Sequence, residues 1–171
     1  TSLNADYENF CDENSYWLED YSLFVALKES YEGAVWTDWP QGARNREVEF
    51  LNDRKVQLRE AIDFEKFVQY IFFEQWMSLK KYCNNQGIEI FGDLPIYVTH
   101  DSSDVWANPK NFKLGRDGNP LLVAGVPPDC FSETGQLWGN PVYNWEVLKN
   151  NSYDWRMQRL QFNLEIMDIM R

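Results

Sequence analysis

The 171-residue sequence predicts an α/β fold, in which a helical part precedes a helix–strand–loop–helix–strand unit. Two observations support this prediction. Apolar residues recur at helical spacing over Asp63–Tyr82, and the short apolar run Ile88–Phe91 follows almost at once. A second helical pattern over Tyr153–Met167 then leads into residues 168–171, which have the composition of another strand. In parallel sheets and barrels the chemistry lies at the C-terminal ends of the strands, so functional residues are expected just after residue 91.

The part before these elements is expected to be helical. Apolar spacing predicts a helix over Ser15–Tyr31, and Gly33 is placed to end it. The aromatic segment Trp36–Pro40 then breaks the pattern, because the proline favours an extended residue before it. Its two tryptophans either pack the helix onto the domain or face a ligand. The charged segment Asn45–Ala61 predicts a solvated helix or helix pair, to which we assign no function.

The two helices of the second part have recognisable ends. Asp63 is a good N-cap for the first, whose broad apolar stripe predicts a helix that faces the core. Gly87 is placed to adopt the left-handed conformation beyond its end, before the candidate buried strand Ile88–Phe91. Ser152 is placed to cap the later helix, over Tyr153–Met167.

Composition limits the possible partners and the compartment. The formal net charge of −11 argues against a nucleic acid or an anionic membrane as partner, since both would repel the chain. Three cysteines without metal-ligand spacing favour a reducing compartment, and we expect a cytoplasmic protein. Because the first residues lack a basic-then-apolar pattern and no apolar run approaches 18 residues, we expect neither a signal peptide nor a membrane span. The opening residues Thr1–Asn4 resemble neither a natural start nor a tag, so we expect the chain to be part of a longer protein.

The segment Gly92–Tyr143 is unusually long for a connection without a sustained period. Connections of about fifty residues are uncommon in a compact domain unless they are functional or disordered. Disorder is disfavoured because the segment is rich in aromatic residues. We therefore predict an ordered, site-forming loop, with a hairpin turn at Asp117–Pro120.

The loop carries six carboxylates and one histidine, the side chains of acid–base chemistry. Glycoside chemistry needs two carboxylates on either side of one bond, but spacing within a loop does not show which two converge. Asp93 is the best single candidate because it follows a predicted strand, although it could instead cap a turn. His100 has no recognisable partner pattern and is expected to be structural. The sequence has no dense set of metal ligands, so we predict no metal site.

Residues 131–143 differ in kind from the rest of the loop, because flat rings alternate with amides, a carboxylate and glycines. A sugar ring is bound by this combination, since its C–H face lies on an aromatic ring while its hydroxyls contact amides and carboxylates. We therefore predict a polar, ring-shaped ligand. The candidate binding residues are Phe131, Glu133, Gln136, Trp138 and Asn140. The high aromatic content, 16% of the chain, also has a simpler explanation, namely core packing.

The segment GDLPIYV, the following HDSSDVWANP and the later GVPPDCFSETGQLWGNPVYNW resemble the 4-α-glucanotransferase (amylomaltase, or disproportionating enzyme) family. The upstream WLEDYSLFVAL and WTDWP match the same family's order, so the resemblance covers nearly the whole chain. It implies part of a catalytic (β/α)₈ barrel with an inserted helical subdomain. Residues 1–62 would form the subdomain and residues 63–171 the barrel part, with the barrel incomplete.

The resemblance also implies an activity and residue roles. The family transfers α-1,4-glucan segments between acceptors by a retaining, covalent route without a cofactor. Asp93 would follow the third barrel strand, and it would contact substrate together with the candidates between residues 131 and 140. Arg171 would be the arginine that lies two positions before the nucleophilic aspartate and donates a hydrogen bond to it. Asp93 and Arg171 would thus support catalysis, while the nucleophile and the acid/base would follow Arg171.

One departure from the family pattern is Cys130, which replaces a tyrosine usual in this loop. Two other functions remain as alternatives. A non-catalytic glucan-binding module would use Trp138 and Phe131 only as platforms, whereas an aromatic-rich interaction scaffold would bind a protein and no sugar.

Overall fold

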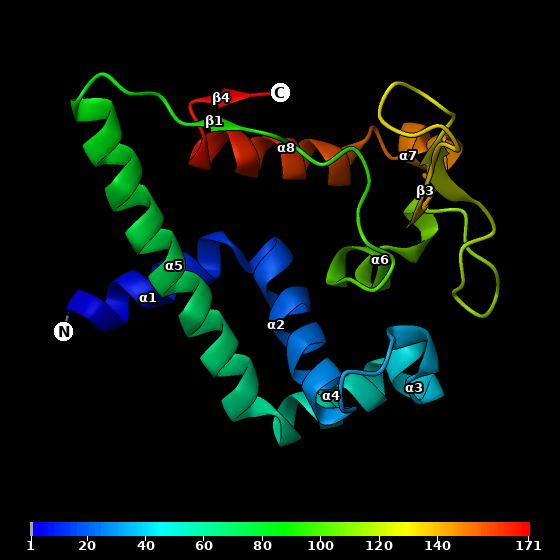
Figure 1. Cartoon of the computed structure of the whole chain (residues 1–171). Helices are drawn as coiled ribbons and strands as arrows, with labels where there is room; N and C mark the ends of the chain where they lie inside the picture. Colours follow the sequence, from blue (N-terminus) through cyan, green and yellow to red (C-terminus); the bar gives the residue numbers. More distant parts are fainter. Residues whose placement is uncertain (1) are drawn as a thin grey trace.

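The computed structural model describes residues 2–171, with side chains described from residue 5 onward. Helices make up most of the chain (Figure 1). In chain order the elements are α1 (Ser2–Glu13), α2 (Ser15–Ser30), η1 (Trp36–Asp38), α3 (Gln41–Arg44), α4 (Val48–Gln57), α5 (Arg59–Asn85), β1 (Phe91–Gly92), α6 (Ser103–Ala107), η2 (Pro109–Asn111), β2 (Val123–Val126), β3 (Gln136–Pro141), α7 (Trp145–Asn150), α8 (Asp154–Ile166) and β4 (Ile169–Met170). In the part of the chain described, no helix is long and apolar enough to cross a membrane.

The first part is helical, as predicted, and α2 occupies nearly the expected range. Gly33 ends it as expected: its φ is +80°, and its amide donates to the Lys28 carbonyl at 2.8 Å. Helix α1 was not predicted. It is held by a small aromatic cluster in which Phe10 packs on Tyr70 and Phe73 of α5. Its apolar residues therefore depend on a partner helix about sixty positions further along the chain.

Helix α5 begins at Arg59, so the prediction that Asp63 caps it is wrong. Asp63 instead lies one turn inside and pairs with Arg59 at 3.6 Å. The opposite end agrees with the prediction, since Gly87 has a φ of +73°. The expectation of a core-facing stripe is wrong for most of its length in the described chain. Exposed stripe residues are Phe64, Phe67, Val68, Phe72, Leu79 and Tyr82, whereas only Ile62 and Tyr70 of α5 are buried.

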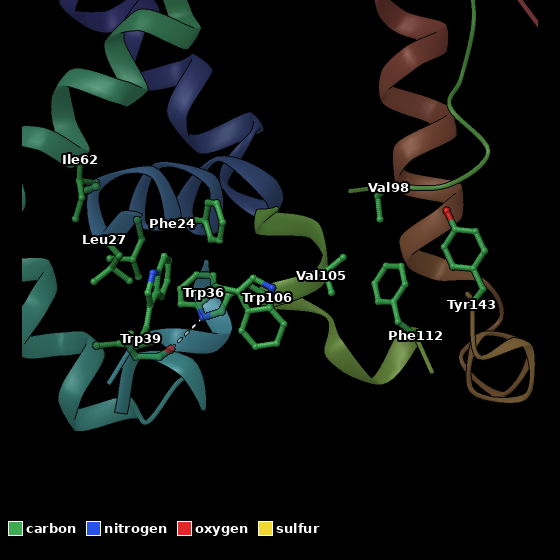
Figure 2. Close-up of a cluster of buried hydrophobic side chains, with 14 of the residues drawn as sticks. Phe24, Leu27, Trp36, Trp39, Ile62, Val98, Val105, Trp106, Phe112 and Tyr143 are labelled. Atoms are coloured by element: carbon green, nitrogen blue, oxygen red, sulfur yellow. Dashed lines mark hydrogen bonds between the residues drawn. The ribbon is translucent and has the colours of Figure 1, made fainter. Parts of the chain in front are cut away.

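The main core is aromatic and joins the two parts of the chain (Figure 2). Trp36 and Trp39 are both buried, which decides for packing over a ligand-facing role. The Trp39 indole donates to Ala34, and the ring of Trp39 meets Trp106 edge to face. Trp106 is fully buried and donates to the Ala43 carbonyl at 2.9 Å, so each buried indole N–H has a partner.

Strands β1 and β4 form a parallel pair, with Phe91 opposite Ile169 and Gly92 opposite Met170 (Figure 1). The predicted strand at residues 88–91 is therefore shifted toward its C-terminal end. It is also not buried in the described chain, because Ile88 and Phe91 are both exposed. The second predicted strand is present, and β4 falls within the predicted 168–171.

The connection into α8 differs from the prediction. Ser152 does not cap this helix: Ser152 and Tyr153 both have positive φ, and Tyr153 is the residue that precedes the first helical turn. The reason is the short helix α7, which the sequence analysis missed. Its last turn ends through bonds from the Ser152 and Tyr153 amides to Lys149 and Leu148. The chain must then turn sharply before α8 begins.

The long segment between β1 and α7 is ordered by short elements, which include α6, η2 and the antiparallel pair β2–β3. The predicted turn at 117–120 is confirmed: the Gly115 amide donates to Asn119 at 2.8 Å, and Leu114 bridges to Pro120. Gly118 in this turn has a φ of +83°, and its carbonyl lies 2.9 Å from the His100 ring nitrogen Nε2.

Candidate functional site

The C-terminal ends of β1 and β4 bring Asp93 and Arg171 together. The guanidinium of Arg171 contacts both carboxylate oxygens of Asp93, with Nη2–Oδ2 at 2.6 Å and Nε–Oδ1 at 3.5 Å. The backbone continues the parallel ladder beneath them, because the Arg171 amide donates to Gly92 at 3.0 Å and the Leu94 amide donates to Arg171 at 3.1 Å. Two residues 78 positions apart in sequence are thus held side by side at a strand edge.

The ion pair sets the charge state of this edge. The hydrogen bond from Arg171, followed by its charge, holds the pKa of Asp93 below its ordinary value. The same contact raises the pKa of Arg171 above its ordinary value. Both side chains are largely exposed, at 58% and 76%, so the pair lies open to solvent and to a ligand. A carboxylate held ionised in this way can accept hydrogen bonds from ligand hydroxyls.

Asp168 holds the two strands in register from the opposite end. Its carboxylate accepts from the Ile90 amide at 2.7 Å and from the Asn84 side chain at 2.8 Å, and it pairs with Lys80 at 3.4 Å. These contacts, the bond from Ile90 first, lower its pKa. No role was predicted for Asp168, because a carboxylate at the first residue of a predicted strand carries little indication of one.

The aromatic loop is the connection between β2 and β3, residues 127–135. Asp129 organises it: the Asp129 carboxylate accepts from the amides of Phe131 and Ser132, each at 2.9 Å. Ser132 then donates through its hydroxyl to the Gly135 carbonyl at 2.7 Å. Gly135 has a φ of +75°, and a Cβ there would lie 2.5 Å from the Val126 carbonyl oxygen. The loop is therefore a defined turn rather than a flexible strap.

Two of the predicted rings are presented to solvent by this sheet. Phe131, at the loop tip, is 87% exposed. Trp138, on β3, is 46% exposed, and its indole donates to the Gln136 side chain at 3.1 Å. A half-exposed indole beside an amide can stack on a ring and hydrogen-bond a hydroxyl at once. Gln136 and Trp138 are thus a paired unit, whereas Phe131 stands apart from them.

The other two loop candidates have different surroundings. Asn140 turns part of its amide inward, where Nδ2 donates to the Val98 carbonyl at 2.9 Å. This contact ties β3 to the segment after β1, and it leaves the amide oxygen as the group for a ligand. Glu133 is exposed at the loop tip, where it contributes a negative charge.

Tyr97 is a candidate that the sequence analysis missed. Its half-buried ring stacks on Tyr143 with centroids 5.5 Å apart, and it meets Trp138 edge to face at 6.5 Å. Tyr143 is itself fixed by its hydroxyl, which donates to Ile96 at 2.7 Å. Tyr97 thereby supports the exposed indole from behind. The feature of the sequence that could have indicated Tyr97 is its position four residues after Asp93, within the motif GDLPIYV.

The remaining acid–base candidates of the loop are structural. His100 contacts Gly118 and packs on the Trp36 ring, as expected for a structural histidine. Asp101 pairs with Lys28. Asp104 lies in a hollow between α2, α6 and α8. Its burial raises its pKa, against the opposing effects of Arg159 and Trp155. Asp117 accepts two bonds from Asn119 within its turn. The structure does not pair any of these carboxylates with Asp93.

The arrangement of elements is similar to that of solved amylomaltases. The solved structure of amylomaltase from Streptococcus agalactiae in complex with acarbose superimposes with a TM-score of 0.94 at 41% identity, covering 100% of this chain and 34% of that chain. The amylomaltase of Corynebacterium glutamicum shares the fold at a TM-score of 0.64 and 19% identity. A model of the 4-alpha-glucanotransferase family matches residues 1–171, and the chain belongs to that family.

Curated relatives agree with this assignment. A 4-alpha-glucanotransferase of Synechocystis is 47% identical over 171 residues, which cover 99% of this chain and 34% of that protein. One of Aquifex aeolicus is 49% identical over 164 residues, 96% of this chain and 34% of that protein. The chain therefore spans about a third of the length of the curated relatives it matches. A chloroplastic/amyloplastic 4-alpha-glucanotransferase of Solanum tuberosum is 43% identical.

Proposed function

We propose that the chain is part of a 4-α-glucanotransferase that transfers α-1,4-glucan segments between maltooligosaccharide or starch-type acceptors. The observation that carries the proposal is the family match over all 171 residues. The exposed rings of Phe131 in the loop and Trp138 on β3, and the strand-end pair of Asp93 and Arg171, add a geometry suited to a glucan. The structural relative bound to acarbose supports an oligosaccharide ligand.

We further propose how these residues divide the work. The Gln136–Trp138 pair would hold one glucose ring, with the indole against its C–H face and the amide on a hydroxyl. Asn140 would add its free amide oxygen, while Phe131 and Glu133 at the loop tip would contact a further sugar. Substrate bound in this way reaches the reacting groups in one orientation, which lowers the entropic part of the barrier.

At the strand edge, Asp93 and Arg171 would support the chemistry without performing it. An ionised Asp93 can fix sugar hydroxyls, and Arg171 has donors left to orient a second carboxylate. In a retaining mechanism that second carboxylate is the nucleophile, and a further acid protonates the leaving oxygen. We propose that both follow Arg171 in a longer protein, which is consistent with the third of the relatives' length that this chain spans.

We propose that the chain is one incomplete catalytic domain, in which about residues 1–62 form a helical subdomain and about 63–171 contribute to a (β/α)₈ barrel. The shared core of the two parts supports a single unit. The parallel β1–β4 pair and the exposed apolar stripe of α5 support further barrel elements packing here. The three free cysteines support a cytoplasmic protein.

The activity is tested on the longer protein that contains this chain. Maltotriose incubated with it should yield glucose together with longer maltooligosaccharides, detected by chromatography. If the protein bound maltoheptaose but left maltotriose unchanged, it would be a glucan-binding module and not a transferase.

The platform is tested by Trp138→Ala in the 171-residue chain. Loss of one stacking ring should weaken maltoheptaose binding about two- to tenfold in isothermal titration, since an aromatic contact of this kind contributes about 0.5–1.5 kcal/mol beyond burial. Trp145→Ala is the matched control, because Trp145 is similarly exposed, at 52%, but lies on α7 outside the loop. Equal affinity of both variants and the unchanged chain would contradict the platform.

A further inference from the structure

A second hollow, distinct from the aromatic loop, lies between α3, η2, the turn around Gly118 and α7, and has a volume of about 580 Å³. Four cationic side chains line it, and Asp117 is the one carboxylate among its lining residues. The four cations are Arg44, Arg46, Lys110 and Arg116. The chain has 16 basic and 27 acidic residues, so a quarter of its basic residues meet at one place on an acidic protein.

Two carboxylates, Asp117 in the lining and Asp20 paired with Arg46, do not neutralise the four cations of this cluster. Asp117 is occupied by Asn119, whose amide and side chain donate to it at 3.1 and 2.9 Å. These bonds, with a smaller contribution from Arg44, hold the pKa of Asp117 below its ordinary value. The cluster therefore keeps an excess of positive charge, which favours an anion as occupant.

Two of the arginines have hydrogen-bonding capacity that the protein leaves unused. Nε of Arg44 and Nη1 of Arg46 are buried, and neither has a partner in the described chain. Buried donors without an acceptor cost free energy, and a small rotation of either guanidinium toward an acceptor in the hollow would remove this cost. An exposed cluster of lysines would offer no such driving force.

Arg46 is also held in place before any ligand arrives. Its Nη2 pairs with Asp20 at 2.6 Å, and its guanidinium lies 4.2 Å from the centre of the Trp106 ring. Arg44 is steered by a long contact of 3.4 Å from Nη1 to the Thr37 carbonyl. Because the planar fork of arginine matches the oxygens of phosphate, two oriented arginines favour a phosphate over a spherical anion.

The remaining lining suits a sugar next to the phosphate. Asn45 and Asn144 bear amides that can donate to and accept from hydroxyls, while the buried Trp36 only closes one wall of the hollow. The volume lies within the range of small-ligand pockets. We propose that this hollow is a binding site for a phosphate monoester, specifically a phosphorylated sugar, in addition to the glucan site of the proposed function.

The test is isothermal titration of the full 171-residue chain, at low ionic strength, with glucose 6-phosphate, inorganic phosphate and glucose. Glucose 6-phosphate should bind, inorganic phosphate should bind more weakly, and glucose should show no binding at this site. The net charge of −11 repels anions in general, so binding would reflect the local cluster. Absence of binding by both phosphate compounds would overturn the proposal, and equal binding of the two would overturn its sugar part.

Charge-neutral variants locate the site. Arg44→Gln and Arg116→Gln should each weaken glucose 6-phosphate binding at least about tenfold, by removing a phosphate contact. Lys149→Gln is the control, because Lys149 is an exposed cation on α7 that does not line the hollow. Arg116 is exposed, so its variant should fold even if Arg44→Gln does not, as checked by circular dichroism. Equal weakening by Lys149→Gln would show unspecific attraction and would overturn the assignment.

Trp138→Ala should leave glucose 6-phosphate binding unchanged, which distinguishes this hollow from the proposed glucan site.

Discussion

At the scale of single residues, the strand edge depends on one ion pair. Asp93 is exposed, so an isolated carboxylate at this position would be screened by water and held only loosely. The bidentate contact with Arg171 fixes its orientation and lowers its pKa. The pair thus gives the edge a defined carboxylate that stays ionised to low pH.

Removal of the arginine should reverse this effect. In Arg171→Gln we expect the pKa of Asp93 to rise toward its ordinary range, as measured by carboxyl-carbon NMR titration. A lowered folded-state pKa stabilises the fold above the unfolded-state pKa, and this contribution is lost as the pH falls through the folded value. The variant should therefore lose less stability than the unchanged chain on acidification.

Asp117 provides the internal control for that titration. Its pKa is also lowered, but by Asn119 rather than by Arg171. It should titrate identically in both proteins. An unchanged Asp93 titration in the variant would show that the ion pair is not formed in solution.

The candidate residues could be predicted from the sequence to different degrees. Asp93 was placed at a strand end because a helix, a glycine and an apolar run precede it, and that placement is correct. The inward bond of Asn140 to Val98 and the support of Trp138 by Tyr97 could not be predicted, since both join segments about forty residues apart. Spacing along the chain does not determine which loop residues meet.

At the scale of elements, the β2–β3 connection has a backbone conformation that requires glycine at one position. Gly135 combines a positive φ with close approach to Val126 and Pro127, whereas Gly139 has a similar φ of +79° and no atom within 4 Å of a Cβ. A substitution at Gly139 therefore measures the cost of backbone strain alone, whereas one at Gly135 adds the cost of steric overlap.

We expect Gly139→Ala to destabilise the chain by about 1 kcal/mol, the usual cost of a left-handed non-glycine residue. Gly135→Ala should cost more, about 2–3 kcal/mol locally, because the loop must also move away from Val126. Urea denaturation measures the change in stability, and maltoheptaose titration measures the change in affinity. Equal destabilisation by the two substitutions would show that the close approach of Gly135 to Val126 adds no cost.

Helices and strands could be predicted where a local sequence pattern determines them, and they could not be predicted where tertiary contacts do. The range of α2 and the glycine end of α5 follow from spacing and from Gly33 and Gly87. Helix α1 was missed because its stability comes from packing on Tyr70. Helix α7 was missed because six residues show too little periodicity. The exposure of the α5 stripe also could not be predicted, because an apolar stripe shows that a face needs covering and not what covers it.

At the scale of the whole molecule, a strongly acidic chain carries an uncovered apolar face. The residues of this face are Phe64, Phe67, Val68, Phe72, Leu79 and Tyr82 of α5. A contiguous exposed apolar surface marks a site of contact with other protein. The uncovered face of α5 agrees with the proposal that further elements of one catalytic domain pack against this helix.

The face should be detectable in the 171-residue chain with an apolar-surface dye. The double variant Phe64→Gln with Phe72→Gln should lower dye fluorescence by roughly half, since both rings are more than half exposed. The control is Val48→Gln with Val56→Gln on α4, where both valines are exposed but scattered. An equal loss of fluorescence in the control would show that the dye does not report this face.

The backbone ladder between β1 and β4 also affects how this sequence can change in length. Asp93 and Arg171 are aligned by strand pairing and by the Asp168 carboxylate, not by the 75 or so residues that connect them. The entropic cost of a longer connection grows only slowly with its length. Insertions or deletions in the connection, for example in the turn at 117–120, can therefore accumulate while the two charged side chains keep their spacing. The proposed glucan-binding residues can then diversify independently of the Asp93–Arg171 pair.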